Sequence, residues 1–221
     1  MDIQDSLIEA IRQADHAAAN TLLADWAAEH GESQLFAEVL EPTLQRIGAE
    51  WKSGESCTIA QAYVAAKVAE DTLLRVATNS PASPPGTDRG PVVLGNIEED
   101  FHALGRRMVG TFLRTKGWTV HDLGNDVTAA EFVDQAVVTG ARVIGVSAMM
   151  LTTARNIRRL REEINRRGLA GRIQLAVGGA VFVVRPALVT EVGGDGTAPS
   201  ALGAAELFER LHHESLRLAP A

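Results

Sequence analysis

The segment PVVLG at residues 91–95 runs directly into NIEEDFHALG at residues 96–105, and this junction decides the fold. Two later runs, RVIGV at residues 142–146 and IQLAV at residues 173–177, have the same length and apolar character. Helix-length segments separate the three runs. Apolar strands that alternate with helices indicate right-handed βαβ units and a parallel sheet with both faces covered.

Two further strands are expected in this half of the chain, WTVHDLG at residues 118–124 and a fifth strand at residues 193–198. The pattern predicts a flavodoxin-like (Rossmann-like), doubly wound, parallel five-stranded sheet, in which ligands bind beyond the carboxyl ends of the strands. The expected helices cover residues 104–116, 129–139, 154–167 and 199–216.

The residues before this sheet have a helical pattern. Apolar side chains recur at three- and four-residue spacing in four segments, around residues 3–14, 15–26, 35–51 and 59–74. Short connections between them favour an antiparallel four-helix bundle. Residues 79–90 are rich in proline and glycine, which cannot continue a helix. The predicted domains are therefore a helical domain at 1–78, a linker at 79–90 and an α/β domain at 91–221.

Composition narrows the class of protein. The 221 residues are 46% hydrophobic with a formal net charge of -7, which is ordinary for a globular protein and disfavours direct nucleic-acid binding. The single cysteine, Cys57, excludes an internal disulfide; we expect a small buried hydrophobe there rather than a reactive thiol. No signal-peptide pattern and no apolar run of about 18 residues is found, so a soluble cytoplasmic protein without membrane partners is predicted.

The loop after residue 95 carries two residues that suit metal chemistry. Its sequence is not a GxGxxG phosphate loop, which disfavours ordinary dinucleotide binding. The Asp100 carboxylate can accept the Nδ1–H of His102, which leaves Nε2 as a metal ligand. One histidine is too few for a zinc site but enough for one axial position of a metal held by a macrocycle. A surface or N-capping histidine is the alternative.

Later strands end in residues that suit the same edge of the sheet. Ser147 supplies a hydroxyl after the apolar run at residues 142–146, and Gly178 and Gly179 follow the run at residues 173–177. Two successive glycines lack Cβ atoms, so a flat group can approach the backbone closely there. A tight turn is the alternative explanation for the two glycines.

These residues together resemble a known signature. Asp100-x-His102-x-x-Gly105, Ser147-x-Met149 and Gly178-Gly179 resemble the DxHxxG…SxL…GG pattern of cobalamin-binding domains. The resemblance extends from about residue 91 to residue 216, and the preceding helices resemble the helical cap domain of the same proteins. The chain is most similar in this respect to the small corrinoid proteins of methyltransferase systems.

The resemblance implies cobalamin as the cofactor, as methylcobalamin or another corrinoid, bound base-off and His-on. His102 would be the lower axial ligand of cobalt, and Asp100 would hydrogen-bond to His102. A hydroxyl of Thr153, or alternatively of Thr152, would extend a proton relay behind the carboxylate. The displaced nucleotide tail would enter a slot beside Gly105, Ser147, Gly178 and Gly179, where a branched side chain at Gly179 is expected to block it without unfolding the domain.

The resemblance also assigns further cofactor contacts and no catalytic residue. Trp51 and Gly54 resemble a Trp-x-x-Gly turn of the cap, where the Trp51 ring either covers the cofactor or simply packs in the core. The chain departs from the family pattern at four positions, where Glu99 replaces a frequent glycine, Ala103 an aspartate, Arg106 a lysine and Met149 a leucine of similar volume. The other expected contacts are Phe101, Leu104, Met149, Leu151 and Ala198.

The resemblance implies a protein that carries a methyl group between partner methyltransferases, with a reductive activase as a further candidate partner. It would not be a complete enzyme alone, because cap and cobalamin domain leave no room for a substrate barrel. The rivals are a cobalamin sensor or photoreceptor and a storage or delivery protein. Gln61 and Ala62 replace the Glu-His pair of light-sensing cobalamin repressors, which counts against the photoreceptor. The arginines of residues 155–167 are expected on a charged outer face or against an acidic partner.

Overall fold

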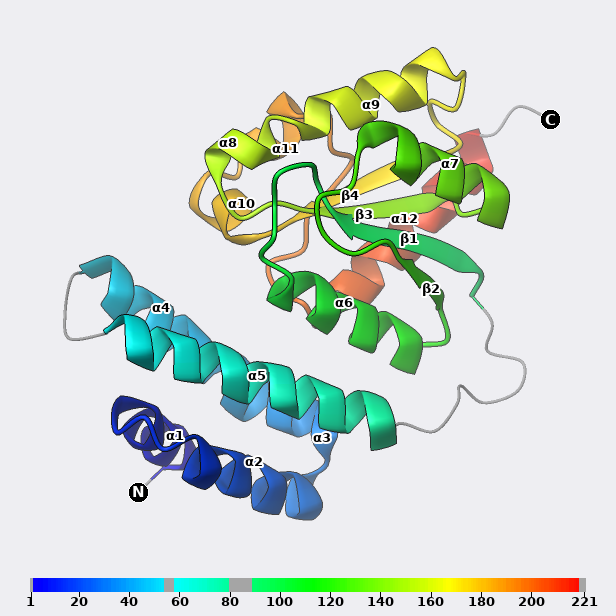
Figure 1. Cartoon of the computed structure of the whole chain (residues 1–221). Coiled ribbons are helices and arrows are strands. Elements are labelled where there is room, and N and C mark those ends of the chain that lie inside the picture. The colour runs from blue at the N-terminus through cyan, green and yellow to red at the C-terminus, as the bar shows by residue number, and fades with distance from the viewer. Residues whose placement is uncertain (1, 54–57, 80–88, 219–221) are drawn as a thin grey trace. The chain divides into compact units, whose positions relative to one another are not determined.

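The computed structural model of the chain describes residues 2–53, 58–79 and 89–218 (Figure 1). Two compact units are present, Met1–Ser80 and Pro81–Ala221. Most of the predicted linker, residues 80–88, lies outside the described residues, as do Gly54 and Cys57. Within the described ranges, no helix has the length and apolar character needed to cross a membrane. The cytoplasmic location stays a prediction.

The second unit is an α/β fold with a parallel sheet, as predicted. Its strands are β1 (Pro91–Asn96), β2 (Thr119–Asp122), β3 (Val143–Ser147) and β4 (Gln174–Gly178), in the spatial order β2-β1-β3-β4. Figure 1 shows helices on both faces of this sheet. The helices are α6 (Leu104–Thr115), α7 (Ala129–Thr139), α8 (Leu151–Ala154), α9 (Ile157–Arg166), α10 (Ala180–Val184), α11 (Leu188–Glu191) and α12 (Ala204–Leu218).

Strands β1, β3 and β4 are buried and largely apolar on both faces because each face packs against a helical layer. Val93, Ile144 and Leu175 are fully buried in one core with residues of α7 and α9. Their neighbours Val92 and Val143 point to the other core, with residues of α6 and α12. Side chains alternate between the two faces of a strand, so both faces require apolar residues here.

The expected fifth strand at residues 193–198 is wrong; the described residues form a four-stranded sheet. This segment makes only an isolated bridge, between Ala176 and Gly196. The side chain of Asp195 accepts the backbone N–H of Leu175 at 2.6 Å, where a strand carbonyl would have accepted it. Arg161 also holds the segment, because its Nε donates to the Gly193 carbonyl at 2.7 Å and its guanidinium pairs with Asp195.

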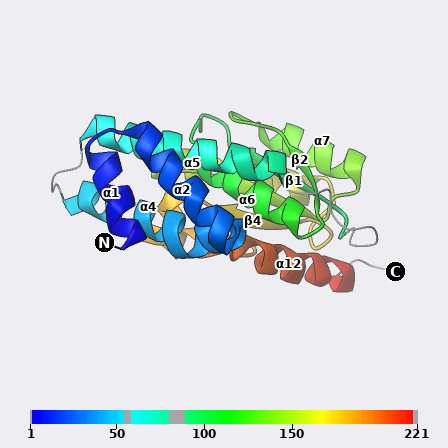
Figure 2. The ribbon, with the colours of Figure 1, turned by 90° about the horizontal axis from the view of Figure 1, so that it is seen from below.

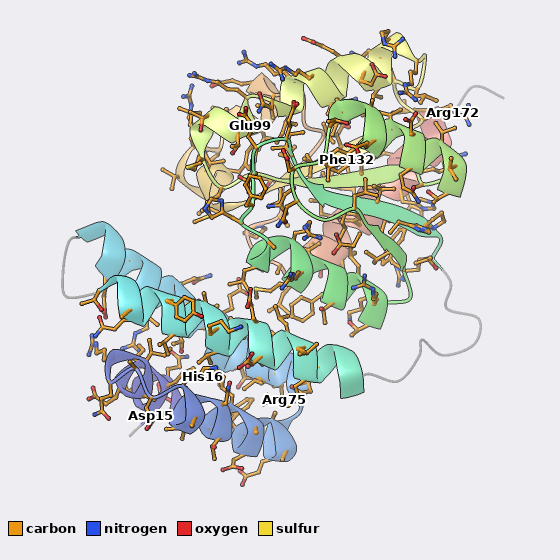
Figure 3. The ribbon with its side chains drawn as sticks, viewed as in Figure 1. Asp15, His16, Arg75, Glu99, Phe132 and Arg172 are labelled. Carbon is orange, nitrogen blue, oxygen red and sulfur yellow. The ribbon has the colours of Figure 1, made fainter. Side chains whose placement is uncertain are left out.

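The first unit is helical but does not consist of four regular helices. The predicted helix at residues 35–51 is interrupted, because a short α3 (Glu32–Gln34) and a π-helix, η1 (Leu35–Leu40), precede α4 (Glu41–Ser53). Figure 2 shows α1, α2 and α5 packed along one another, and Figure 3 places Asp15 and His16 at the start of α2. The bounds of these three helices are α1 (Ile3–Arg12), α2 (His16–His30) and α5 (Ile59–Asn79).

Gly95 in β1 tests how closely the sheet packs against α7. A Cβ atom at this position would lie 2.6 Å from Cζ of Phe132, a fully buried ring on α7 (Figure 3). We expect Gly95→Ala to lower the free energy of unfolding by about 1–3 kcal/mol through overpacking. Urea unfolding measures this change. The matched variant is Gly95→Ala with Phe132→Leu, in which the two losses should be less than additive; additive losses would mean that the two residues do not compete for space.

Candidate functional site

The carboxyl edge of the sheet brings together residues from three strands. Asn96 at the end of β1 pairs in register with Ser147 of β3, and Ser147 pairs with Gly178 of β4. The loop between β1 and α6, residues 97–103, begins at this edge and carries Asp100 and His102. The residues that the sequence places at successive strand ends are therefore neighbours in space.

Asp100 is fully buried and accepts four hydrogen bonds. Its Oδ1 accepts from Asn96 Nδ2 at 2.8 Å and from the backbone N–H of His102 at 3.0 Å. Its Oδ2 accepts from the backbone N–H of Met149 at 2.7 Å and from the Thr153 hydroxyl at 2.9 Å. Each carboxylate oxygen has two donors, so the orientation of the carboxylate is fixed.

The hydrogen bonds also set the ionisation of Asp100. Burial on its own would raise the pKa of this carboxyl, because it penalises the charged form. The four donors outweigh burial, and together they hold the pKa of Asp100 below its usual range. Asp100 is therefore an anionic acceptor at neutral pH.

His102 is held beside this carboxylate with half of its side chain exposed. Its Nδ1 lies 3.4 Å from Asp100 Oδ1, and its side chain is 50% exposed. Its backbone carbonyl accepts from Asn96 Nδ2 at 3.1 Å, which fixes the loop below the ring. In the described part of the chain, no group of three or more His, Cys, Asp or Glu side chains suits a metal ion. The site therefore contains one imidazole that could bind a metal, with the Asp100 carboxylate on its Nδ1 side.

Of the two hydroxyls that the resemblance left open, the structure brings Thr153 to Asp100. Thr153 is 2% exposed and lies in α8, one residue after the exposed Thr152. The Thr153 Oγ1 is also 3.1 Å from the carbonyl of Met150, so its single proton can go to either acceptor. A threonine hydroxyl therefore lies behind the carboxylate on the side away from His102.

A cavity of about 220 Å³ lies in the second unit at the same edge. Gly105, Ser147, Gly178, Gly179 and Ala198, five of the predicted cofactor contacts, line it. A Cβ atom at Gly105 or Gly178 would meet no atom within 4 Å, so these glycines leave space open rather than permit close packing. Sequence reasoning missed the apolar wall, which includes Leu94, Val109, Val183, Leu207 and Phe208.

Gly179 has a different role from Gly178, and the expectation for its substitution is wrong. Its φ is +115°, and a Cβ atom there would lie 2.0 Å from the carbonyl oxygen of Ala148. Any side chain at Gly179 strains the backbone and collides with it, so a branched residue cannot be added without disturbing the fold. Gly178 is the position from which a side chain would enter the cavity.

The remaining predicted contacts lie around the site or outside the described region. Phe101 is 65% exposed, Met149 is exposed, and Leu104 and Leu151 are half-buried. Trp51 belongs to α4 in the other unit, and its side chain lies outside the described residues. Contacts of these five residues with a cofactor stay predictions.

The structure also shows a polar pair that the sequence did not reveal as part of the site. Arg106 is 6% exposed, and its Nε donates to Asn96 Oδ1 at 2.7 Å. Asn96 is fully buried and, through Nδ2, donates to both Asp100 and His102. The available signal was Arg106 itself, an arginine in the first turn of a helix where the family pattern has lysine.

The arginine-rich segment of residues 155–167 is largely neutralised within the unit. Arg159 pairs with Glu98, Arg161 with Asp195, and Arg167 with Asp134 and Glu163. The side chain of Glu163 also accepts a hydrogen bond from Arg166. The hydrogen bonds from Arg166 and Arg167 lower the pKa of Glu163 to about 2. This pattern favours the charged outer face over a site for an acidic partner.

Comparisons with known proteins identify the family. The family model described as B12 binding domain matches residues 90–206, more than half of the chain. A corrinoid protein from Desulfitobacterium hafniense is 31% identical over 170 residues, which cover 76% of this chain and 77% of that protein. Dimethylamine corrinoid protein 3 of Methanosarcina acetivorans is 39% identical over 99 residues, 44% of this chain. This second alignment spans 46% of the relative, less than half of its length.

A solved structure supports the fold. The monomethylamine corrinoid protein of Methanosarcina barkeri matches with a TM-score of 0.78 at 24% identity, over 95% of this chain and 98% of that one. At this identity the match concerns the fold alone.

Glu99, beside the buried carboxylate, has an unfavourable backbone conformation. Its φ is +69°, in the left-handed region that glycine tolerates and other residues rarely adopt. Glu99 is labelled in Figure 3. Its backbone N–H donates to Asp126 Oδ1 at 2.8 Å, and this bond does not need the side chain. The family's frequent glycine at this position has a physical reason.

We expect Glu99→Gly to raise the free energy of unfolding by up to about 1 kcal/mol, because the Cβ–carbonyl repulsion disappears. The matched control is Glu99→Ala, which removes the carboxylate but keeps Cβ. Urea unfolding compares the two variants with the parent. A gain of the same size in Glu99→Ala would assign the effect to the lost charge and not to the backbone.

Proposed function

We propose that this chain, which belongs to the B12 binding domain family and takes cobalamin or a related corrinoid as its cofactor, carries a methyl group between partner methyltransferases. The observation that carries the proposal is the Asp100–His102 pair, a buried anionic carboxylate beside a half-exposed imidazole. It lies at the carboxyl edge of the sheet, next to a cavity that two glycines keep open.

The residues present fit a corrinoid. The exposed side chains of Phe101, Met149 and Val183 supply an apolar surface at the edge, which suits one face of a flat macrocycle. The cavity of about 220 Å³ is several times the roughly 30 Å³ that one water occupies in the liquid, so it can take a ring system. The open space at Gly105 and Gly178 supports entry of the displaced nucleotide tail there.

When bound, the cofactor would supply a cobalt ion that can take up and release a methyl group. His102 would hold this ion through Nε2. Asp100 would keep the proton of His102 on Nδ1, because an ionised carboxylate accepts and does not donate. Thr153 and the backbone N–H of Met149 hold the second oxygen of Asp100, so the carboxylate cannot rotate away from the imidazole.

The partners are part of the proposal. A chain that holds the cofactor needs one methyltransferase to supply the methyl group and another to remove it, and a reductive activase to restore oxidised cobalt. The two Methanosarcina relatives above are named as dimethylamine and monomethylamine corrinoid proteins, so methylamines are the first donors to test.

The sensor reading receives no support from the helical unit. Gln61, which replaces the glutamate of the light-sensing pattern, is used at the start of α5. Its Oε1 accepts from the Thr58 N–H at 2.7 Å, and its Nε2 donates to the Arg12 carbonyl at 2.9 Å. A side chain engaged in capping a helix and joining it to α1 serves the fold of this unit.

The test of the carrier function uses the intact chain loaded with cobalamin and reduced anaerobically. We expect it to take up one isotopically labelled methyl group from a methylamine with its methyltransferase, and to release that group to an acceptor system.

His102→Ala should lose the axial nitrogen seen by electron paramagnetic resonance of the Co(II) form. Asp100→Asn should be milder, with a loss of about 10–100-fold in affinity or activity.

Failure of the loaded wild-type chain to take up label, together with a change in its oligomeric state on illumination, would contradict the carrier function and favour the sensor. A nitrogen signal that survives in His102→Ala would contradict the role of His102.

Gly178→Val tests the nucleotide slot. We expect the fold to accept the branched side chain, because nothing lies within 4 Å of a Cβ atom at this position. The side chain would fill part of the cavity, and we expect it to weaken cobalamin binding at least about tenfold. The control ligand is cobinamide, which has the corrin ring without the nucleotide tail, and its affinity should stay unchanged. Equal losses for both ligands would place the tail elsewhere.

A further inference from the structure

Asn96 connects three groups of the site with one amide. Its Nδ2 donates to Asp100 Oδ1 at 2.8 Å and to the His102 carbonyl at 3.1 Å, and its Oδ1 accepts from Arg106 Nε at 2.7 Å. The side chain is fully buried at the end of β1. Both hydrogens of the amide are thus spent on the carboxylate and on the backbone of the predicted metal ligand.

Arg106 determines which way this amide faces. A guanidinium donates hydrogen bonds and accepts none, so the atom of Asn96 that faces it must be the oxygen. The NH₂ group must then face Asp100 and His102. With the amide turned over, its oxygen would face the carboxylate and the carbonyl, and two acceptors would be left in contact without a hydrogen between them.

Arg106 is itself fixed from the neighbouring strand. Its Nη1 forms an ion pair with Asp122 at the end of β2, and its Nη2 donates to Asn125 Oδ1 at 3.2 Å. Two nitrogens of the guanidinium therefore donate hydrogen bonds, to Asn96 on β1 and to Asn125 in the loop after β2, and the third is held by the ion pair with Asp122. The side chain is 5% exposed and is not free to move toward solvent.

We propose that Asn96 and Arg106 are positioning residues for the cofactor, which act through Asp100 and the His102 peptide to aim the imidazole at cobalt. The proposal rests on the proposed function, since it assumes that His102 is the ligand. It deepens that function by tracing the orientation of one imidazole to an asparagine–arginine pair of this chain and, through Asp122, to the end of β2.

Two substitutions disrupt the Asn96–Arg106 pair in different ways. Asn96→Asp keeps the shape of the side chain and a partner for Arg106, but it replaces the two amide hydrogens with an acceptor. Arg106→Met removes the donor that fixes the amide and keeps much of the apolar stem. Arg106→Lys is the conservative variant, because its ammonium can still donate to Asn96. Arg155→Met, at an exposed arginine after α8, controls for the loss of one positive charge.

The main readout is the axial nitrogen coupling in the electron paramagnetic resonance spectrum of the cobalamin-loaded protein in its Co(II) form. We expect the ratio of histidine-bound to histidine-free cobalt to fall roughly tenfold in Asn96→Asp and in Arg106→Met, the low end of the range for partners outside the ligand shell. Arg106→Lys and Arg155→Met should keep the wild-type ratio. Cobalamin should remain bound in all four, because the cavity that receives the tail retains its glycines.

A second readout needs no cofactor. Amide hydrogen exchange of the free protein at His102 and Met149, whose N–H groups bond to Asp100, should speed up in Asn96→Asp and not in Arg155→Met. This measurement remains informative if Arg106→Met does not fold.

The outcomes separate the two proposals. No nitrogen coupling in the wild-type protein, or coupling that survives in His102→Ala, contradicts the proposed function and this inference with it. Coupling that depends on His102 but keeps its wild-type ratio in both Asn96→Asp and Arg106→Met contradicts this inference alone.

Discussion

One buried carboxylate organises the functional edge of this protein. Asp100 has no exposed surface, and a charge in that environment is costly unless donors surround it. The four donors come from the end of β1, from the loop that carries Asp100, from the chain just after β3, and from α8. The four hydrogen bonds to this carboxylate therefore fix the relative positions of those segments. The position of His102 depends on them, because it lies on the same loop.

The space beside the carboxylate has a separate origin, in small residues on one face of the neighbouring strands β3 and β4. Gly145 pairs in register with Ala176, and Ser147 with Gly178; all four line the cavity. A Cβ at Gly145 would lie 2.5 Å from the Leu94 side chain and 2.6 Å from the Phe208 ring, so larger residues cannot replace it. The core between the sheet and α12 is close-packed up to Gly145 and opens only at the strand ends.

The sequence predicted those features that depend on local pattern. Alternating apolar runs and helical segments gave the parallel sheet, and the comparisons confirmed the family that Asp100, His102 and the paired glycines indicate. The fifth strand failed because a side chain of Asp195 satisfied the N–H of Leu175, which no backbone pattern reveals. Asn96 and Arg106 were missed for the same reason: ten residues separate them, and only the folded loop and helix bring Oδ1 to Nε.

Asp100 and His102 lie on one loop but differ in exposure. This difference explains how the loop can be rigid and still present an accessible imidazole. The carboxylate is enclosed by donors, whereas half of the adjacent imidazole is exposed. The rigid residue is therefore the buried Asp100. Its hydrogen bonds hold the loop even though Glu99, one residue earlier, has a left-handed backbone conformation. The exposed ring needs no direct packing to be oriented, because its peptide is held by Asn96 on the carbonyl side and by Asp100 on the N–H side. An imidazole so arranged keeps a fixed direction without a closed pocket around it.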